Sequence, residues 1–132
     1  MKAVAIVKGG APVGPHVEIL DVPEPEAGAG EVSIRTEASA LNHLDLFVGA
    51  GLPGIDRPYP RVTGSDGVGV VDAVGEGAGR FAVGDRVCAL LAGGGYAQQV
   101  VCPEGHVLPI PDGMSMVEAA ALPEVLATAW LN

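Results

Sequence analysis

Short apolar runs, many of them rich in valine, recur between turn signals along the chain up to residue 110. Strand-length apolar runs bounded by Gly and Pro are typical of β-strands joined by tight connections. The pattern predicts strands at residues 3–7, 17–22, 32–41, 68–74, 86–91, 96–101 and 107–110. This spacing favours a compact antiparallel barrel.

Residues 40–48 break the strand pattern and predict a short helix. The apolar positions follow helical spacing at Leu41, Leu44 and Val48. A helix here would present Asn42 and His43 near its start.

A second helical region follows the last predicted strand. Ser115 and Glu118 fit a Ser-x-x-Glu capping box, which predicts a helix beginning at Ser115. We expect Pro123 to end or reset this helix and residues 124–132 to form another one. Because the chain ends on an apolar Trp130-Leu131 pair and Asn132 without a stop signal, we expect it to be a fragment of a longer protein.

Composition and charge exclude several classes of protein. The 132 residues fit one domain, and 48% hydrophobic with 17% charged residues is not typical of a disordered chain. Seven Lys and Arg against sixteen Asp and Glu give a net charge of −9, with no basic cluster, so we expect no nucleic-acid partner. The apolar stretches are far shorter than the roughly 20 residues that span a bilayer, so we expect no membrane partner.

The N-terminal segment and the cysteines add a cellular context. The apolar run before Lys8 is too short for the core of a signal peptide, so we expect a cytoplasmic protein. Cys88 and Cys102 stand alone in apolar, strand-like runs, and we expect both to be reduced and structural.

Seven motifs now give the sequence a specific resemblance. In chain order they are Met1-Lys2-Ala3-Val4; Pro25-Glu26 with Gly30-Glu31-Val32; Ala38-Ser39-Ala40-Leu41-Asn42; Gly64-Ser65-Asp66-Gly67-Val68-Gly69-Val70-Val71; Val83-Gly84-Asp85-Arg86-Val87; Gly94-Gly95-Tyr96-Ala97; and Ala119-Ala120-Ala121-Leu122-Pro123. Through them the sequence resembles the N-terminal GroES-like catalytic domain of the medium-chain dehydrogenase/reductase superfamily. Within it, the chain is most similar to the zinc-free, zeta-crystallin-like quinone oxidoreductases.

The resemblance implies a fold and an activity. The fold would be mainly β, a GroES-like, partly open β-barrel with short helices over residues 1–122. Residues 123–132 would begin the connection to a Rossmann domain that is absent from this chain. The complete enzyme would be a homodimeric, NADPH-dependent reductase of quinones or enones, with most of the NADPH bound by the Rossmann domain. The fragment alone would be inactive.

The same resemblance implies that zinc is not used. Zinc-dependent relatives need three ligands and an open coordination site. Asn42 stands at the position of their ligating Cys, and Ser65 replaces the His of their Gly-His-Glu motif. We therefore expect no zinc.

Asn42 and His43 are the expected catalytic residues. Asn42 matches the active-site Asn of the family, which can hydrogen-bond the cofactor's ribose or the substrate. It also suits a helix N-cap, and the two roles can coexist. His43 would donate to a developing enolate oxygen or a ribose hydroxyl, or lie on the surface. For Asp45 we expect a structural salt bridge or a supporting role.

Four further residues complete the expected site. Thr128 matches the family Thr that approaches the nicotinamide, although it also suits a solvent-facing helix position. Phe47 and Tyr59 would line the substrate cleft, but neither reproduces the family Tyr that orients nicotinamide or quinone. Glu124 would line the same cleft or serve as a first-turn helix acid.

Two glycine-rich segments have a structural rather than a phosphate-binding interpretation. Residues 77–82 fit G-x-G-x-x-A, but helical periodicity does not follow, so we do not expect a phosphate cradle. The glycines at residues 67–69 are better interpreted as part of a barrel bend, where a missing Cβ relieves crowding.

Two functions other than a quinone reductase are also open. The chain could be a stand-alone GroES-like binding module that docks through Val125, Leu126 and Trp130. It could also be an enoyl-reductase module of a larger synthase.

Overall fold

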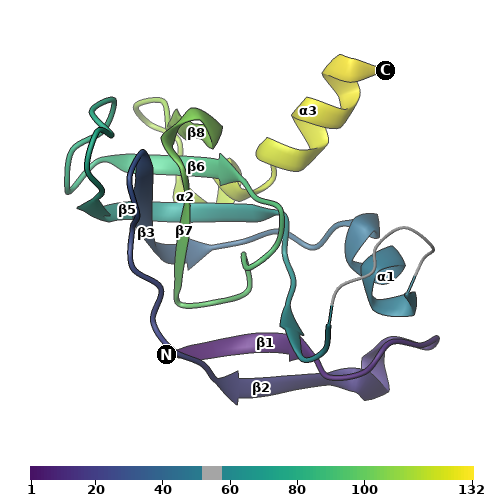
Figure 1. Cartoon of the computed structure of the whole chain (residues 1–132). Helices are drawn as coiled ribbons and strands as arrows, with labels where there is room; N and C mark the ends of the chain where they lie inside the picture. The colour runs from purple at the N-terminus through teal and green to yellow at the C-terminus, as the bar shows by residue number, and fades with distance from the viewer. Residues whose placement is uncertain (52–57) are drawn as a thin grey trace.

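The strands form two antiparallel sheets (Figure 1). The computed structural model describes residues 1–51 and 58–132. In spatial order, the small sheet contains β2 (Val17–Asp21), β1 (Lys2–Ile6) and β4 (Arg61–Val62). The large sheet contains β7 (Gln99–Pro103), β3 (Glu31–Ala38), β5 (Asp66–Val74), β6 (Arg86–Leu90) and β8 (Val107–Pro109).

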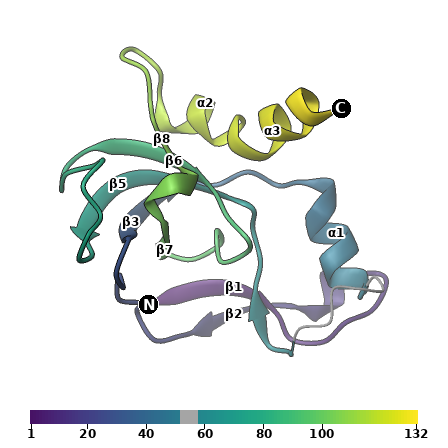
Figure 2. The same ribbon diagram turned by 45° about the horizontal axis from the view of Figure 1, so that its top comes forward.

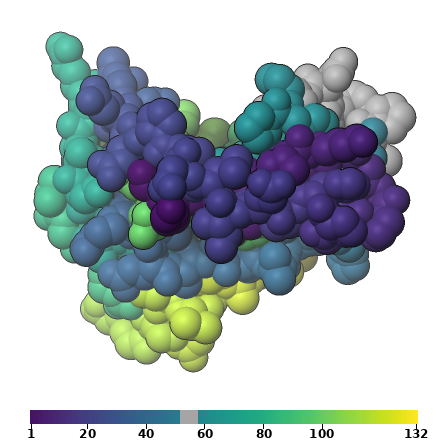
Figure 3. All heavy atoms as spheres, turned by 90° about the horizontal axis from the view of Figure 1, so that it is seen from below, coloured from purple at the N-terminus to yellow at the C-terminus, as the bar shows by residue number. Residues whose placement is uncertain are grey.

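The segment before β7 joins the two sheets into a partly open barrel. Ala3 in β1 makes an isolated bridge with Ala97, and the Val4 amide donates to the Tyr96 carbonyl at 2.8 Å. The Thr36 amide in β3 donates to the Gln98 carbonyl at 2.9 Å. Figure 3 shows β1 and β2 covering one face of the molecule, with the C-terminal part of the chain at the opposite edge. The expected barrel is confirmed.

Three short α-helices accompany the sheets: α1 (His43–Ala50), α2 (Met116–Ala120) and α3 (Pro123–Leu131). Single 3₁₀ turns, η1 (Gly14–His16) and η2 (Glu104–His106), precede β2 and β8. Figure 2 shows α2 and α3 following one another above the large sheet, while α1 lies at the end of the barrel. None of the helices in the described part of the chain is long and apolar enough to cross a membrane.

The predicted starts of the two C-terminal helices are confirmed. Ser115 is the N-cap of α2, and its hydroxyl accepts the Glu118 amide while the Glu118 carboxylate accepts the Ser115 amide. Pro123 then opens α3, where its fixed φ and missing N–H suit the first turn. The helix predicted within residues 40–48 is α1, but it begins after Asn42, so Leu41 lies outside it and is 87% exposed.

Several predicted strand limits are wrong. β3 ends at Ala38 rather than at residue 41, and β7 begins at Gln99 rather than at residue 96. Residues 95 and 96 instead donate their amides to the carbonyls of Gly64 and Thr63, because this segment bridges the two sheets. β5 begins two residues early, at Asp66, and the two-residue strand β4 was not predicted.

The large sheet buries apolar side chains on both faces. One cluster combines residues from β3, β5, β6, β7 and β8 with a neighbouring leucine, namely Val32, Ile34, Val71, Val87, Ala89, Leu91, Val100, Cys102 and Val107. The other cluster packs α2 against the opposite face and contains Val68, Cys88, Ile110, Ala119 and Ala120. Because side chains alternate across a strand, Val87 and Ala89 face one cluster while Cys88 faces the other.

Gly69 allows β3 and β5 to approach at an irregular point of their ladder. The register between these strands shifts between Thr36 and Ala38, and Gly69 pairs with Thr36. A Cβ on Gly69 would lie 1.9 Å from the Arg35 carbonyl oxygen. Gly69 therefore meets a steric requirement of this bend, as the sequence predicted.

We expect Gly69→Ala to lower the free energy of unfolding by about 3 kcal/mol, because the strands must separate to admit the methyl group. Urea denaturation followed by circular dichroism measures this change. Gly105→Ala is the matched control, since a Cβ there meets nothing within 4 Å. A Gly69 variant as stable as the Gly105 variant would contradict the steric argument.

Candidate functional site

A buried carboxylate at the start of β5 connects three elements. The Asp66 residue is 1% exposed. Its Oδ2 accepts Asn42 Nδ2 at 2.6 Å, and its Oδ1 accepts the Glu124 amide at 2.8 Å. The Ser39 hydroxyl donates to the Asp66 carbonyl at 2.6 Å. Asp66 therefore fixes the beginnings of both α1 and α3 against the large sheet.

Asn42 has two structural partners at the start of α1. It is the N-cap of the helix in a capping box with Asp45, whose carboxylate accepts the Asn42 amide N–H at 2.8 Å. Its side-chain nitrogen binds Asp66. Asp45 Oδ2 also accepts the Tyr96 hydroxyl, which in addition lies 2.9 Å from the Ala40 carbonyl oxygen. The supporting role expected for Asp45 is thus realised by hydrogen bonds rather than by a salt bridge.

Burial dominates the protonation of this network. It raises the pKa of Asp66, although hydrogen bonds from the Glu124 amide and Asn42 act in the opposite direction. Burial also raises the pKa of Tyr96, and the adjacent Asp45 adds to the effect. Both buried thiols are free, and burial raises the pKa of Cys88 and brings that of Cys102 to about 11. Neither thiol is an activated nucleophile.

Helix α3 adds two of the predicted residues to the same region. The Glu124 backbone binds Asp66, and the Glu124 side chain accepts the Thr128 hydroxyl at 3.3 Å. Thr128 lies one turn further along α3 and is exposed. The structure therefore brings Asn42, Glu124 and Thr128 into one connected hydrogen-bonded arrangement through Asp66.

The remaining predicted residues lie elsewhere on α1 or near its end. His43 is the first residue of α1 and is exposed, whereas Phe47 is 49% exposed further along the helix. Tyr59 is half-buried, and its hydroxyl accepts Arg61 Nη2 at 2.8 Å. Since Arg61 also binds the Val48 carbonyl, Tyr59 is placed at the C-terminal end of α1, away from Asn42.

Two residues of this region were not proposed as functional from the sequence alone. Asp66 was noted only as part of a motif whose zinc-ligating His is absent, and Tyr96 only as part of a glycine-rich motif. An acid at the start of a Val-rich strand was the signal for Asp66, because a buried carboxylate needs donors from neighbouring elements. No local signal identified Tyr96, whose partners lie 51 and 56 residues away.

Asn42 and Ser65, which stand where the zinc-dependent relatives carry ligands, do not offer the atoms that zinc prefers. Asn42 offers an amide and Ser65 a hydroxyl, whereas zinc sites use thiolate, imidazole and carboxylate. Across residues 1–51 and 58–132, no group of three or more His, Cys, Asp or Glu side chains could hold a metal ion.

The glycine loop after β5 holds a carboxylate of the protein itself. Glu104 accepts the backbone amides of Gly79 and Arg80, each at 2.9 Å, and Arg80 Nη1 donates to the Glu104 carbonyl. The two amide bonds lower the pKa of the Glu104 carboxyl. The amides that a phosphate would require are therefore already occupied.

Comparison with known proteins agrees with this fold. The chain matches the family described as alcohol dehydrogenase GroES-like domain over residues 28–112. It is 40% identical over 109 residues to the human synaptic vesicle membrane protein VAT-1 homolog-like, covering 81% of this chain and 26% of that protein. It is 36% identical over 126 residues to the chloroplast envelope quinone oxidoreductase homolog of Arabidopsis thaliana, covering 92% and 38%. It is also 39% identical over 107 residues to component PikAII of the Streptomyces venezuelae pikromycin polyketide synthase, covering 81% and 3%.

Solved structures give the same result. The human VAT-1 homolog-like protein superposes with a TM-score of 0.94 at 34% identity, covering 99% of this chain and 42% of that one. The quinone oxidoreductase from Thermus thermophilus, also solved in complex with NADPH, superposes with a TM-score of 0.81 at 39% identity, covering 99% and 39%. The chain belongs to the alcohol dehydrogenase GroES-like domain family and spans less than half the length of these relatives.

We expect Asp66→Asn to change how stability depends on pH. Because burial raises the pKa of Asp66 above the 3.8 of an unburied aspartate, the folded protein retains a proton that the unfolded chain has released. The wild-type chain therefore loses stability relative to the variant as pH rises from about 3.8 through the folded-state pKa. Urea unfolding between about pH 4 and 7 measures the difference.

Asp72→Asn is the control, because it removes one negative charge from an exposed position and leaves the buried carboxylate of Asp66 in place. The same pH trend in both variants would show that overall charge, rather than burial at Asp66, causes the effect.

Proposed function

We propose that this chain is the catalytic domain of an NADPH-dependent, zinc-independent reductase that transfers hydride to quinones or other conjugated carbonyls. The family membership supports an oxidoreductase, and relatives named as quinone oxidoreductases support this acceptor class. The observation that carries the proposal is the fixed orientation of the Asn42 amide.

The orientation follows from the chemistry of Asp66. An ionised carboxylate only accepts hydrogen bonds, so Asn42 must direct its Nδ2 toward Asp66. The side-chain oxygen Oδ1 of Asn42 is consequently the acceptor end of the amide; it faces the Asp45 amide in the capping box, and its second lone pair is available to another donor. It is suited to accept a hydrogen bond from a hydroxyl of the cofactor's ribose.

The residues present fit the nicotinamide end of a dinucleotide better than its phosphates. NADPH would supply the hydride, while Asn42 and Thr128 would position its ribose and nicotinamide. The glycine loop is filled by Glu104, so the phosphates would be held by another part of the protein. We assign residues 1–122 to the catalytic domain and 123–132 to the start of the connection to a nucleotide-binding Rossmann domain.

Other predicted residues would contact the hydride acceptor. His43 would donate to oxygen as negative charge develops there, in place of a Lewis-acidic metal. Phe47 and Glu124 would border the substrate cleft, whereas Tyr59, which was predicted there as well, packs at the other end of α1. The complete enzyme would form a homodimer.

A second candidate is an enoyl-reductase module of a larger synthase, which the similarity to the PikAII component favours. Both candidates share hydride transfer to a conjugated carbonyl. A preference of several orders of magnitude for thioester-linked enones over quinones would favour the synthase module.

We expect the natural gene product that carries these residues to bind NADPH and oxidise it with para-benzoquinone, whereas residues 1–132 alone do not. Isothermal titration with NADPH and the loss of NADPH absorbance measure the two properties. Tight NADPH binding by residues 1–132 would contradict the proposed division between domains. A gene product without binding or turnover would contradict the reductase and leave a binding module.

Within the same gene product, we expect Asn42→Ala and Asn42→Ser to lower kcat/KM about 10- to 100-fold, because both remove the oriented amide. Both variants lose the hydrogen bond to Asp66, but Ser is a good N-cap, so the Ser variant should keep the capping contribution to the stability of α1 that the Ala variant also loses. Steady-state kinetics and urea denaturation separate the two effects. An Asn42→Ser variant with the kcat/KM of the wild type would contradict the positioning role of Asn42 and leave it as a helix N-cap.

A further inference from the structure

Of the three guanidinium nitrogens of Arg61 in β4, one is hydrogen-bonded and two are unpaired. Its Nη2 donates to the Val48 carbonyl at 3.1 Å and to the Tyr59 hydroxyl at 2.8 Å, and the group lies 4.6 Å from the centre of the Tyr59 ring. Its Nε and Nη1 are buried without a hydrogen-bond partner. In the described ranges the salt bridge is Lys2–Asp21, so no described carboxylate pairs with Arg61.

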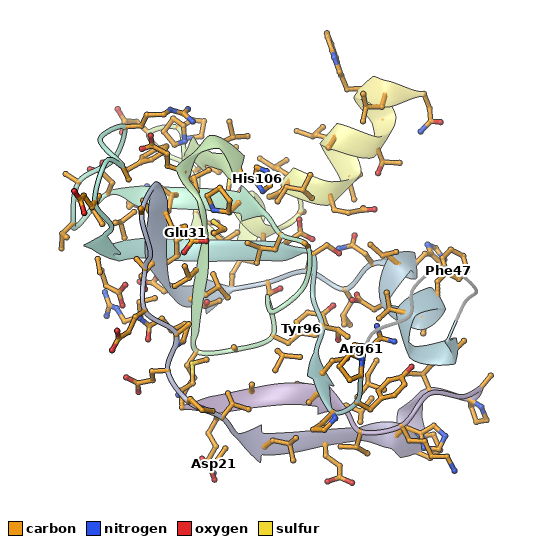
Figure 4. All side chains as sticks on the ribbon, viewed as in Figure 1. Asp21, Glu31, Phe47, Arg61, Tyr96 and His106 are labelled. Carbon is orange, nitrogen blue, oxygen red and sulfur yellow. The ribbon has the colours of Figure 1, made fainter. Side chains whose placement is uncertain are left out.

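A cavity of about 330 Å³ adjoins this cation. Its polar lining comes from Asp45, Arg61, Thr63 and Ser65, and its apolar lining includes Leu44 and Val48. Ser65 is 4% exposed, and its hydroxyl has no partner. Figure 4 shows Arg61 beside Tyr96, between the small sheet and α1. Two residues that carry unsatisfied donor groups, four positions apart in one segment, thus line one cavity.

The two groups together favour an anion. The buried, unpaired N–H groups of the half-buried Arg61 and the buried, unpaired hydroxyl of Ser65 both cost free energy, which a ligand oxyanion would offset. The Asp45 carboxylate lines the same cavity, but it accepts the Asn42 amide and the Tyr96 hydroxyl and forms no salt bridge with Arg61. The chain carries sixteen acidic residues, yet none of those described is paired with this arginine.

We propose that this cavity is an anion subsite in which Arg61 and Ser65 bind a carboxylate attached to a small apolar body. The cation pairs with the carboxylate, the Ser65 hydroxyl donates to it, and Leu44 and Val48 contact the apolar part. That the carboxylate belongs to the hydride acceptor rests on the proposed function. The enzyme would then prefer conjugated carbonyl compounds that carry an acid group.

Benzoate and its neutral isostere benzamide test the subsite directly. Isothermal titration of the natural gene product in the absence of NADPH should show benzoate binding about tenfold tighter than benzamide, as expected for charge-assisted hydrogen bonds. Equal affinities, or no binding of benzoate at millimolar concentration, would overturn the proposal.

Three variants identify the residues responsible. Arg61→Gln should abolish the preference for benzoate, whereas the exposed Arg35→Gln, which removes the same charge elsewhere, should retain it. Ser65→Ala should weaken benzoate binding severalfold without lowering the urea midpoint, because it removes an unsatisfied hydroxyl. If Arg61→Gln fails to fold, the Ser65 variant decides: unchanged benzoate affinity would overturn the proposal.

The outcome is independent of the reductase assignment. Benzoate binding that depends on Arg61, in a protein that does not oxidise NADPH, would support the subsite and reject the reductase. Para-benzoquinone turnover without a preference for benzoate would reject the subsite alone.

Discussion

The organisation of the site depends on one buried carboxylate. Asp66 sits where β5 of the large sheet begins and receives hydrogen bonds from the side chain of Asn42 and the backbone of Glu124. These partners open α1 and α3, so a single side chain sets how two helices meet the barrel. A buried carboxylate is costly unless its oxygens are satisfied, and this cost makes the arrangement specific.

The barrel holds Asp66 at that point through long-range backbone contacts. Residues 96–98 pair with β1 on one side and β3 on the other, which sets the distance between the sheets. The close approach at Gly69 bends β5 just after Asp66. Tyr96, which belongs to the bridging segment, also donates to Asp45. The framework and the start of α1 are thus one continuous structure.

The side chains of the site do not suit a zinc ion. Asn42 offers an oriented amide and Ser65 a buried hydroxyl, whereas zinc binds thiolate, imidazole or carboxylate. In the proposed reductase, positioning by Asn42 and Thr128 takes the place of Lewis-acid polarisation. The proposed anion subsite would add electrostatic recognition of the acceptor, because Arg61 brings a positive charge into a cavity lined largely by neutral groups.

Local patterns in the sequence determined a large part of this protein. Valine-rich runs between glycines predicted most strands, the Ser115–Glu118 box predicted the start of α2, and ordered motifs indicated the family. Such features depend on interactions within a few residues, or on motifs that keep their order along the chain. Asn42, Thr128 and Glu124 were also selected in this way, and the structure connects them.

Only the tertiary structure decided which groups become partners over long distances. The sequence could not show that Asp66 binds residues 24 and 58 positions away, or that Tyr96 reaches Asp45. It also could not show that Tyr59 packs at the opposite end of α1 from Asn42. Nor could it show that the segment of Arg61 and Ser65 shares a cavity with α1 and Leu91. Burial and hydrogen-bond satisfaction are properties of the packed chain, and they arise only when distant strands and helices come together.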